Sequence, residues 1–283
     1  MKKIGFIILH YNCYEDTKVC IDSILLLNQQ EKIEILVVDN ASGNDSFQKL
    51  RNEYKGLGIH FLAMKKNLGF SRANNCAFSY LRTKCDMDMV VFANNDTCFP
   101  QKDFIEKIVR EYQKSNFSVL GVDVYNPKLE IHQSPISTKM ARTKASMRKT
   151  IFCNKIALRF FDLYFKIFVE NKPETVKQVP ESELFYREGI IPVGACLIFS
   201  QNYFDTKEKI FYPETFFYYE EYILAWWCLK HDKKIIFNPD IQVYHNHGKA
   251  TKSIGSQKQS AKFQMNHILK SASVYLNVLK ERM

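Results

Sequence analysis

Residues 89–97 read Met-Val-Val-Phe-Ala-Asn-Asn-Asp-Thr, an apolar run that ends abruptly in two amides and a carboxylate. The run from Met89 to Ala93 is typical of a buried strand. In an open α/β sheet, ligands bind beyond the carboxyl ends of the strands, so we expect Asp96 at the edge of a ligand site. A carboxylate there is a hard oxygen ligand, suited to Mg²⁺ or Mn²⁺ bound together with phosphate. Taken alone, the segment also fits a polar turn, because Asn and Asp favour turns.

Two earlier apolar runs end in the same way. The run at residues 4–9 precedes Tyr11 and Asn12, and the run at residues 33–38 precedes Asp39. Helical stretches separate the runs, and apolar strands that alternate with helices indicate a parallel sheet covered on both faces. Because the carboxyl ends of parallel strands share one edge, we expect the three polar clusters to converge on a ligand site. There, Asp39 can accept hydrogen bonds from a ribose or a base.

Several classes of protein are disfavoured by motifs that the sequence lacks. No Gly-x-Gly-x-x-Gly motif accompanies Gly69, which argues against a dinucleotide-dependent dehydrogenase. The eight cysteines form no Cys-x-x-Cys pair, which argues against a zinc site and favours reduced thiols in a cytosolic protein. No apolar run reaches the roughly 18 residues of a membrane-spanning helix. The apolar run near the N-terminus has no signal-peptide cleavage site, so we interpret it as a strand.

The net charge of +10 comes from two segments. Nine Lys and Arg residues against two acidic residues lie between Lys139 and Lys172, and seven against one lie between Lys249 and Met283. Such segments suit a phosphate-rich partner or an anionic membrane surface, or they are ordinary solvated faces. No nucleic-acid recognition motif accompanies them, so we expect no nucleic-acid partner.

Both basic segments also have helical patterns. Residues 151–169 mix aromatic and aliphatic side chains with Lys and Arg, which predicts a basic, aromatic helix or helical hairpin. This element either lies on a membrane interface or packs on the domain. From Ser260 onward, apolar residues recur at helical spacing and predict a basic amphipathic helix. Packing on the body, pairing with another chain and contact with lipid all remain open for it, as does the oligomeric state.

The last third of the chain contains another buried-strand pattern, at residues 189–199, and then a pair of carboxylates. Glu220 and Glu221 directly follow four aromatic residues. Burial and a like-charged neighbour raise a carboxyl pKa, as a general base requires, and the alternative of a charged helix N-terminus is compatible with that role. A helix to Leu229 and short strands at 234–237 and 241–244 follow. His245 and His247 then suggest metal ligands.

Together these segments resemble the inverting family 2 glycosyltransferases, in particular their rhamnosyltransferase-like bacterial branch, over most of the chain. The resemblance implies a GT-A fold, an α/β fold with a Rossmann-like, doubly wound, mostly parallel sheet, a C-terminal acceptor-binding part and helical additions. It depends on the order and spacing of short motifs, each weak alone: Val37-Val38-Asp39-Asn40-Ala41-Ser42, Asn67-Leu68-Gly69-Phe70 with Asn74-Asn75, Asn94-Asn95-Asp96-Thr97, Gly194-Ala195, Phe216 to Glu221, and Val243-Tyr244-His245 with Gly248.

The resemblance assigns a role to each candidate residue. Asp96, in an Asn-Asn-Asp version of the family's Asp-x-Asp motif, and His245 would hold Mg²⁺ or Mn²⁺. Glu221 would be the catalytic base, with Glu220 beside it. The donor, a nucleotide-diphosphate sugar of the dTDP-rhamnose or UDP-hexose type, would be bound by Tyr11, Asn12, Asp39, Asn40, Asn67, Gly69, Asn74, Asn94 and Asn95.

The implied domain organisation is a GT-A domain over residues 1–250 and a basic amphipathic helix over 251–283. Within the domain, residues 1–126 form the nucleotide-sugar half, 127–182 a basic aromatic helical insertion, and 183–250 the acceptor and catalytic half. The implied reaction transfers a sugar, with inversion, to a hydroxyl of a growing glycan linked to undecaprenyl diphosphate. Its setting would be bacterial surface polysaccharide synthesis, O-antigen or capsule, in the cytoplasm at the inner face of the cell membrane.

Three residues depart from the family pattern. Glu221 stands where Asp is usual, Ile223 where an acidic residue is frequent, and Trp227 where an Arg is frequent. These departures keep open an alternative function, a non-catalytic sugar-nucleotide or glycan-binding protein derived from a transferase.

Overall fold

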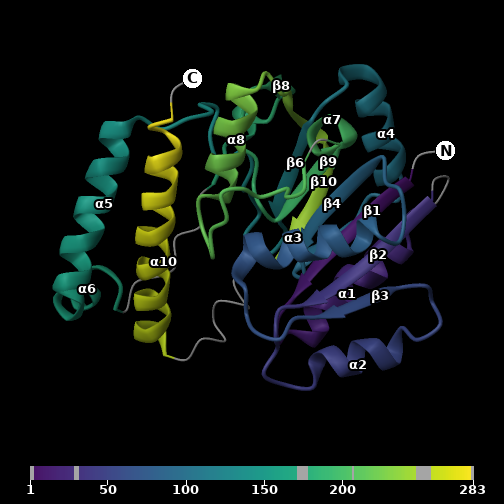
Figure 1. Ribbon diagram of the computed structural model, residues 1–283, viewed down its shortest axis with the longest axis horizontal. Helices are drawn as coiled ribbons and strands as arrows, with labels where there is room; N and C mark the ends of the chain where they lie inside the picture. Colours follow the sequence, from purple (N-terminus) through teal and green to yellow (C-terminus); the bar gives the residue numbers. More distant parts are fainter. Residues whose placement is uncertain (1–2, 29–31, 171–177, 206, 247–255, 282–283) are drawn as a thin grey trace.

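The computed structural model describes residues 3–28, 32–170, 178–205, 207–246 and 256–281. Within these residues, ten strands form one mixed sheet, with eight of them in the order β3-β2-β1-β4-β9-β6-β10-β5 (Figure 1). The two others, β7 (Ile131–His132) and β8 (Arg187–Glu188), pair with β6 and β10. The predicted α/β class is confirmed.

The N-terminal half is the parallel part of the sheet. Alternate residues of its first strand face opposite layers: Phe6 packs in the core under the first two helices, whereas Ile7 packs against the third helix. Both faces of the strands are therefore covered, as continuous apolar strands require. The elements of this half are β1 (Lys3–His10), α1 (Tyr14–Leu25), β2 (Lys32–Asp39), α2 (Ser46–Glu53), β3 (His60–Ala63), α3 (Gly69–Arg82) and β4 (Met89–Asn94).

The C-terminal half mixes strand directions. Strand β9 (Cys196–Ser200) lies between β4 and β6 (Val119–Asn126) and is antiparallel to both. The strand predicted at residues 189–199 was thus too long, since the structure has a loop directly before Cys196. Pro192 has no N–H to donate to a neighbouring strand. The two short strands predicted near the end are instead one strand, β10 (Ile235–His245), with a register shift between Asn238 and Gln242. Pro239 accounts for the shift, since it cannot donate to the ladder.

Two helices of the insertion and the long C-terminal helix form a separate layer. Figure 1 shows α5 (Lys144–Arg159) beside α10 (Gln257–Val278), with the sheet on the other side of α10. Met147 of α5 packs with Ala272 and Tyr275 of α10. The remaining helical elements are α4 (Phe104–Ser115), α6 (Phe161–Phe168), the 3₁₀ turn at Glu181–Glu183, α7 (Gln201–Phe204) and α8 (Glu220–Lys230); the last strand is β5 (Thr97–Cys98).

The predicted C-terminal helix is confirmed and begins three residues earlier than its apolar pattern. Ser256 caps it, because the Ser256 side chain accepts from Gln259 N while the Gln259 side chain accepts from Ser256 N. No helix in the described part of the chain is both long and apolar enough to cross a membrane. All eight cysteines are free thiols.

Candidate active site

The carboxyl ends of β1, β2 and β4 lie side by side. In the sheet register His10 is opposite Asp39, and Leu9 is opposite Asn94. The predicted convergence of the three polar clusters on one edge is therefore present. Asp39 is 7% exposed, and its Oδ1 accepts hydrogen bonds from Ser42 N at 3.0 Å and Ser42 Oγ at 2.5 Å. Among the described residues, no hydrogen-bond donor contacts its other carboxylate oxygen, which suits a ligand hydroxyl or N–H at the strand end.

Hydrogen bonds connect the turn after β1 to the loop after β2. Asn12 has a φ of 60°, and its N–H donates to Ser42 Oγ at 2.8 Å. The Asn12 side-chain oxygen accepts from Gly43 N at 2.8 Å, and its carbonyl accepts from Asn44 Nδ2 at 2.9 Å. These bonds fix the backbone that follows the half-buried Tyr11, the residue directly after His10, which lies opposite Asp39 in the sheet.

Asn40 and Asn67 hold the beginning of α3. Asn40 Oδ1 accepts from Leu68 N at 2.8 Å, and Asn40 Nδ2 donates to Asn67 Oδ1 at 3.1 Å. Gly69 has a φ of +74°, and a Cβ there would lie 2.5 Å from the carbonyl oxygen of Phe216. Gly69 therefore satisfies two needs at once, a left-handed backbone and close contact with a distant loop. Asn74 is buried farther along the same helix.

The two polar residues directly after β4, Asn95 and Asp96, contact different parts of the molecule. Asn95 donates to Thr17 Oγ1 at 3.0 Å, and Thr17 Oγ1 in turn lies 2.6 Å from His10 Nδ1. The other ring nitrogen of His10 lies 2.8 Å from Ser46 Oγ. Burial lowers the pKa of His10 to about 4, so this ring is neutral and serves the network behind the strand ends. Asn94 is half-buried and Asp96 follows it at the edge.

Asp96 and His245 lie side by side in the structure, although they are far apart in the sequence. The Asp96 Oδ1 and His245 Nε2 atoms are 3.2 Å apart, and both side chains are largely buried. His245 Nδ1 lies 2.9 Å from Gln133 Oε1, so the ring is held between Gln133 and Asp96. A carboxylate oxygen and an imidazole nitrogen side by side are suited to bind one cation, and a second-shell partner on Nδ1 is usual for a metal-bound His.

The donor set for a metal is small. No group of three or more His, Cys, Asp or Glu side chains able to hold a metal ion occurs among the described residues. Asp96 and His245 alone would leave most coordination positions to phosphate oxygens and water. That arrangement fits Mg²⁺ or Mn²⁺ sites in which one or two protein ligands act with a substrate phosphate. His247 and Gly248 lie outside the described residues.

Glu221 is joined to this edge through the loop that precedes β9. Its Oε1 accepts from Gly194 N at 3.1 Å. The next residue, Ala195, accepts at its carbonyl from Asn94 N at 2.9 Å and from Thr97 Oγ1 at 3.1 Å. Two consecutive residues therefore link the predicted base to the Asn94–Thr97 segment. Burial raises the pKa of Glu221 above its ordinary value.

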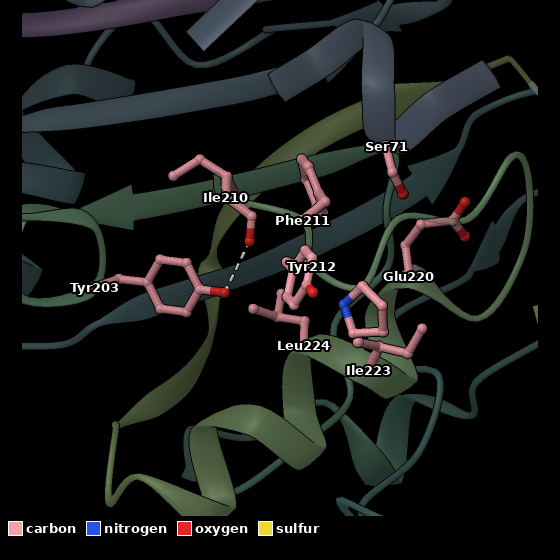
Figure 2. Close-up of a pocket in the computed structure, with 9 residues that line it drawn as sticks. Ser71, Tyr203, Ile210, Phe211, Tyr212, Glu220, Ile223 and Leu224 are labelled. Atoms are coloured by element: carbon pink, nitrogen blue, oxygen red, sulfur yellow. Dashed lines mark hydrogen bonds between the residues drawn. The ribbon is translucent and has the colours of Figure 1, made fainter. Parts of the chain in front are cut away.

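Glu220 faces a different environment. Its side chain borders a small cavity, with Ser71 toward the same end and Tyr203, which donates to the Ile210 carbonyl, toward the other (Figure 2). Burial, and then the neighbouring Glu221 charge, raise the pKa of Glu220 well above its ordinary range. The cavity, about 10 Å³, has room for one water molecule and not for a sugar. Of the two carboxylates, only Glu221 is connected to the strand edge.

The beginning of α8 has an unusual backbone. Tyr218 and Tyr219, directly before Glu220, have φ values of 71° and 70°. Such a conformation costs about 1 kcal/mol or more for each residue that is not glycine, so neighbouring contacts must hold it. The Tyr219 ring stacks on Tyr275 of α10 with centroids 5.7 Å apart, and its hydroxyl accepts from Arg142 at 3.3 Å. Ser271 of α10 donates to the Phe217 carbonyl at 2.7 Å.

Three participants were not among the residues singled out from the sequence. Ser42 holds Asp39, Gln133 orients His245, and Gly194 N binds Glu221. Ser42 and Gly194 lie within quoted motifs, so their signal was present. Nothing in the sequence around Gln133 distinguishes it from an ordinary surface glutamine.

The parallel strands of the N-terminal half, the antiparallel β9 and the polar strand edge together fit the GT-A class of glycosyltransferase fold. The sequence profile described as "Glycosyl transferase family 2" matches residues 6–170, more than half of the chain. The chain therefore belongs to glycosyl transferase family 2, a family of sugar-transferring enzymes. No curated protein matches it at the sequence level.

Solved structures share this fold at low identity. The mannosyltransferase PcManGT from Pyrobaculum calidifontis, in complex with GDP-Man and Mn²⁺, aligns with a TM-score of 0.55 and 13% identity over 97% of this chain and 72% of its own. The 1–349 fragment of TarS from S. aureus aligns with a TM-score of 0.54 and 13% identity over 99% of this chain and 76% of its own. The chain spans only 42% of the longer TarS structure.

Proposed function

We propose that the protein is a metal-dependent, inverting glycosyltransferase that moves a sugar from a nucleotide-diphosphate donor to an acceptor hydroxyl. The observation that carries the proposal is the direct link between the two halves of the site. Gly194 binds the Glu221 carboxylate, and Ala195, the next residue, binds Asn94 and Thr97 on either side of the Asp96 segment. Two adjacent residues, Gly194 and Ala195, thus connect the proposed base to the segment that would hold the diphosphate.

The donor half would bind the nucleotide. Asp39 accepts from the ribose or base, with Tyr11 and Asn12 beside it, while Asn94 and Asp96 lie near the diphosphate. Asn40, Asn67, Gly69 and Asn95 support this surface mainly through contacts within the protein. Asn74 would contribute its buried Nδ2, which has no hydrogen-bond partner among the described residues. Donors of the dTDP-rhamnose or UDP-hexose type remain our expectation. The PcManGT structure contains GDP-Man, so the test below includes guanosine nucleotides as well.

Asp96 and His245 would hold Mg²⁺ or Mn²⁺. The geometry that supports them is the 3.2 Å approach of Asp96 Oδ1 to His245 Nε2, with Gln133 fixing the ring. When bound, the metal supplies charge neutralisation for the departing nucleoside diphosphate, which is worth several kcal/mol in such reactions. The Mn²⁺ in the PcManGT structure is consistent with this assignment.

Glu221 would take the proton from the acceptor hydroxyl. The acceptor oxygen then forms a bond to the anomeric carbon as the bond to the diphosphate oxygen breaks, and the configuration inverts. A raised carboxyl pKa suits this role because it brings the basicity of Glu221 closer to the working pH. Gly194 N donates to the carboxylate and so orients it.

The acceptor would be a hydroxyl of a growing glycan linked to undecaprenyl diphosphate, in surface polysaccharide synthesis at the inner face of the membrane. A rhamnosyltransferase is the specific form suggested by the motifs. The departures at Ile223 and Trp227 do not favour a non-catalytic protein. Ile223 is buried in the cluster that contains Tyr219 and Tyr275, and Trp227 packs on Tyr203 and under Lys207. Both residues therefore have packing roles of their own.

The test is a panel of nucleoside diphosphates and sugar nucleotides of uridine, deoxythymidine and guanosine, each with and without Mn²⁺ or Mg²⁺. We expect one nucleotide to raise the thermal midpoint by several degrees in the presence of metal, because a ligand that binds only the folded state stabilises it. Asp96→Ala should abolish the shift, whereas Asp103→Ala, which changes a half-exposed carboxylate directly before α4, should retain it. No shift with any nucleotide would overturn the proposal.

A second readout separates transfer from binding. Release of nucleoside diphosphate from the selected donor, alone or with a glycan acceptor, is expected for a transferase. Binding with no release under any condition would favour the non-catalytic alternative.

A further inference from the structure

The outer face of α5 and α6 is unusually apolar for an exposed surface. Six of the fourteen exposed large apolar side chains among the described residues lie between residues 152 and 168. Phe152, Phe160 and Leu163 are 64%, 60% and 59% exposed. Phe152 and Ile156 lie one turn apart on α5, Leu163 and Ile167 lie one turn apart on α6, and Phe160 occupies the corner between the helices. We call this surface the α5–α6 outer face.

The same helices carry exposed positive charge and almost no negative charge. Helix α5 contains no acidic residue, and the acidic residue of α6, Asp162, binds Lys258 of α10 at 2.8 Å. Exposed apolar residues interleaved with basic ones are typical of a helix that lies in a membrane interface. The exposed basic residues of the outer face are Arg148, Lys149, Lys155, Arg159 and Lys166.

This face is distinct from the surface by which the two helices join the molecule. Met147 of α5 packs with Ala272 and Tyr275 of α10, and Phe161 and Phe165 of α6 pack with Met265. The core contacts of the hairpin are thus made on the side facing α10. Figure 1 shows α5 and α6 at the edge of the molecule, with α10 between them and the rest. The outer apolar residues are therefore not needed for that core.

We propose that the α5–α6 outer face docks the protein on a bilayer of anionic phospholipids. Two features favour a bilayer over a second copy of the chain. Lys and Arg among the apolar residues complement lipid phosphates, whereas two such faces brought together would oppose like charges. Protein interfaces are also depleted in Lys, which contributes three of the five basic residues here.

Docking through this face would bring the acceptor side of the site near the membrane. Helix α10 lies between α5 and α8 in Figure 1, and Met147 of α5 belongs to the same packed cluster as Tyr219, directly before Glu220. Ser271 of α10 binds the Phe217 carbonyl on that loop, so the same helix contacts both the hairpin and the catalytic loop. Placing the site near a lipid-linked acceptor is an advantage that rests on the proposed function, whereas the docking itself does not rest on it.

The experiment is flotation of the full chain with phosphatidylcholine vesicles that contain or lack phosphatidylglycerol. We expect binding to the anionic vesicles alone, weakening as salt rises. Lys155→Glu/Arg159→Glu should lower the affinity for anionic vesicles about 25-fold or more, since each basic residue near a surface contributes roughly a fivefold factor. Phe152→Ser/Leu163→Ser should lower it about tenfold or more, because two apolar side chains no longer enter the interface. The matched controls, Arg51→Glu/Lys55→Glu and Leu26→Ser/Leu57→Ser, change exposed residues elsewhere and should bind as the unchanged protein does.

Three outcomes would overturn docking: no vesicle binding, equal binding to neutral vesicles, or outer-face variants that bind as well as the controls. If the outer-face variants instead convert a dimer to a monomer in light scattering, the face joins two copies and the bilayer is excluded. The thermal shift with nucleotide and metal is measured without vesicles. It therefore tests the proposed function separately, and either proposal can fail while the other stands.

Discussion

The proposed donor and acceptor sides of the site, called the donor side and the acceptor side below, are held in different ways. Around Asp39, short polar bonds connect loops that follow neighbouring strands, as in the bond from Asn12 N to Ser42 Oγ. Around Glu220 and Glu221, an unfavourable backbone at Tyr218 and Tyr219 is held by Tyr275 and Arg142, which are remote in the sequence. The donor side is a local structure, whereas the acceptor side depends on helices added to the fold.

Substitution of the base should separate the two sides most strongly. We expect Glu221→Gln to lower the rate of transfer about a thousandfold, within the range for loss of a general base, and to leave metal-dependent donor binding intact. The amide keeps the size of the side chain but cannot accept the proton. The measurement is single-turnover transfer, combined with the donor-induced thermal shift of the same variant.

Glu220→Gln is the matched control for that prediction. Glu220 borders the small cavity and not the strand edge, so its amide variant should keep most of the transfer rate. If Glu220→Gln were inactive and Glu221→Gln active, the two carboxylates would have to exchange roles.

The two sides should also respond to pH in opposite directions. The pKa of His10 is lowered to about 4 from an ordinary 6.5, so the unfolded chain binds a proton in this window and the folded chain does not. Stability is complete above pH 6.5 and is lost as the pH falls toward 4, by about 3 kcal/mol for this group. Urea unfolding of the unchanged protein and of His10→Gln should show a shallower acid slope for the variant.

The counterpart on the acceptor side is Glu220, whose pKa is raised by burial. Here the folded chain holds the proton that the unfolded chain releases, so stability falls as the pH rises above the ordinary carboxyl pKa of about 4.3. Glu220→Gln should make that decline shallower, and the raised pKa of Glu221 accounts for the decline that remains. Both tryptophans of the chain lie on α8, so their fluorescence follows this side directly. Parallel slopes for the two variants would mean that the sides do not differ in this way.

These comparisons also explain which features the sequence could predict. The ends of β1, β2 and β4 were predictable because an apolar run followed by polar residues marks a buried strand and its exit. The direction of β9 was not, because a short run buried on both faces has the same pattern in a parallel and an antiparallel strand. The sequence predicted two strands where the structure has one, β10, because Pro239 interrupts the apolar pattern of that strand.

The site shows the same limit. Asp39 and Asp96 could be proposed because each follows its own strand, within a few residues of the pattern that identifies it. The contact of Gln133 with His245 spans 112 positions, and that of Arg142 with Tyr275 spans 133. Such contacts depend on how the elements pack, which no local pattern specifies. Sequence reasoning therefore found the groups suited to chemistry and missed those that orient them.

The junction between the two sides should be sensitive to one methyl group. In Gly69→Ala, the new Cβ would meet the Phe216 carbonyl at 2.5 Å and would occupy a backbone with a φ of +74°. We expect a loss of about 2 kcal/mol in the free energy of unfolding, measured by urea titration. Gly56→Ala is the control, because its φ of +84° is equally unfavourable but nothing lies within 4 Å of the new Cβ. Equal losses in both variants would show that the contact with Phe216 contributes nothing.

The smallest expected effect tests whether α10 positions the catalytic loop or merely stabilises it. Tyr275 is fully buried, and its hydroxyl accepts from Arg142 N at 3.1 Å, while the Arg142 side chain donates to Tyr219. Tyr275→Phe should cost about 1 kcal/mol of stability. Tyr54→Phe on the donor side removes a similarly buried hydroxyl that donates to Asp22 at 2.7 Å and should cost about as much.

The two variants should differ in catalysis despite this similar loss of stability. If Arg142 and Tyr275 hold Tyr219 for the sake of Glu221, Tyr275→Phe lowers kcat several-fold while the KM for the donor stays unchanged, and Tyr54→Phe changes neither. A small displacement of a reacting group is enough for such a loss, because rate depends steeply on its position. Equal kcat values in the two variants, measured well below both thermal midpoints, would show that α10 stabilises the loop without positioning it. Gly194 would then be the residue that orients the proposed base.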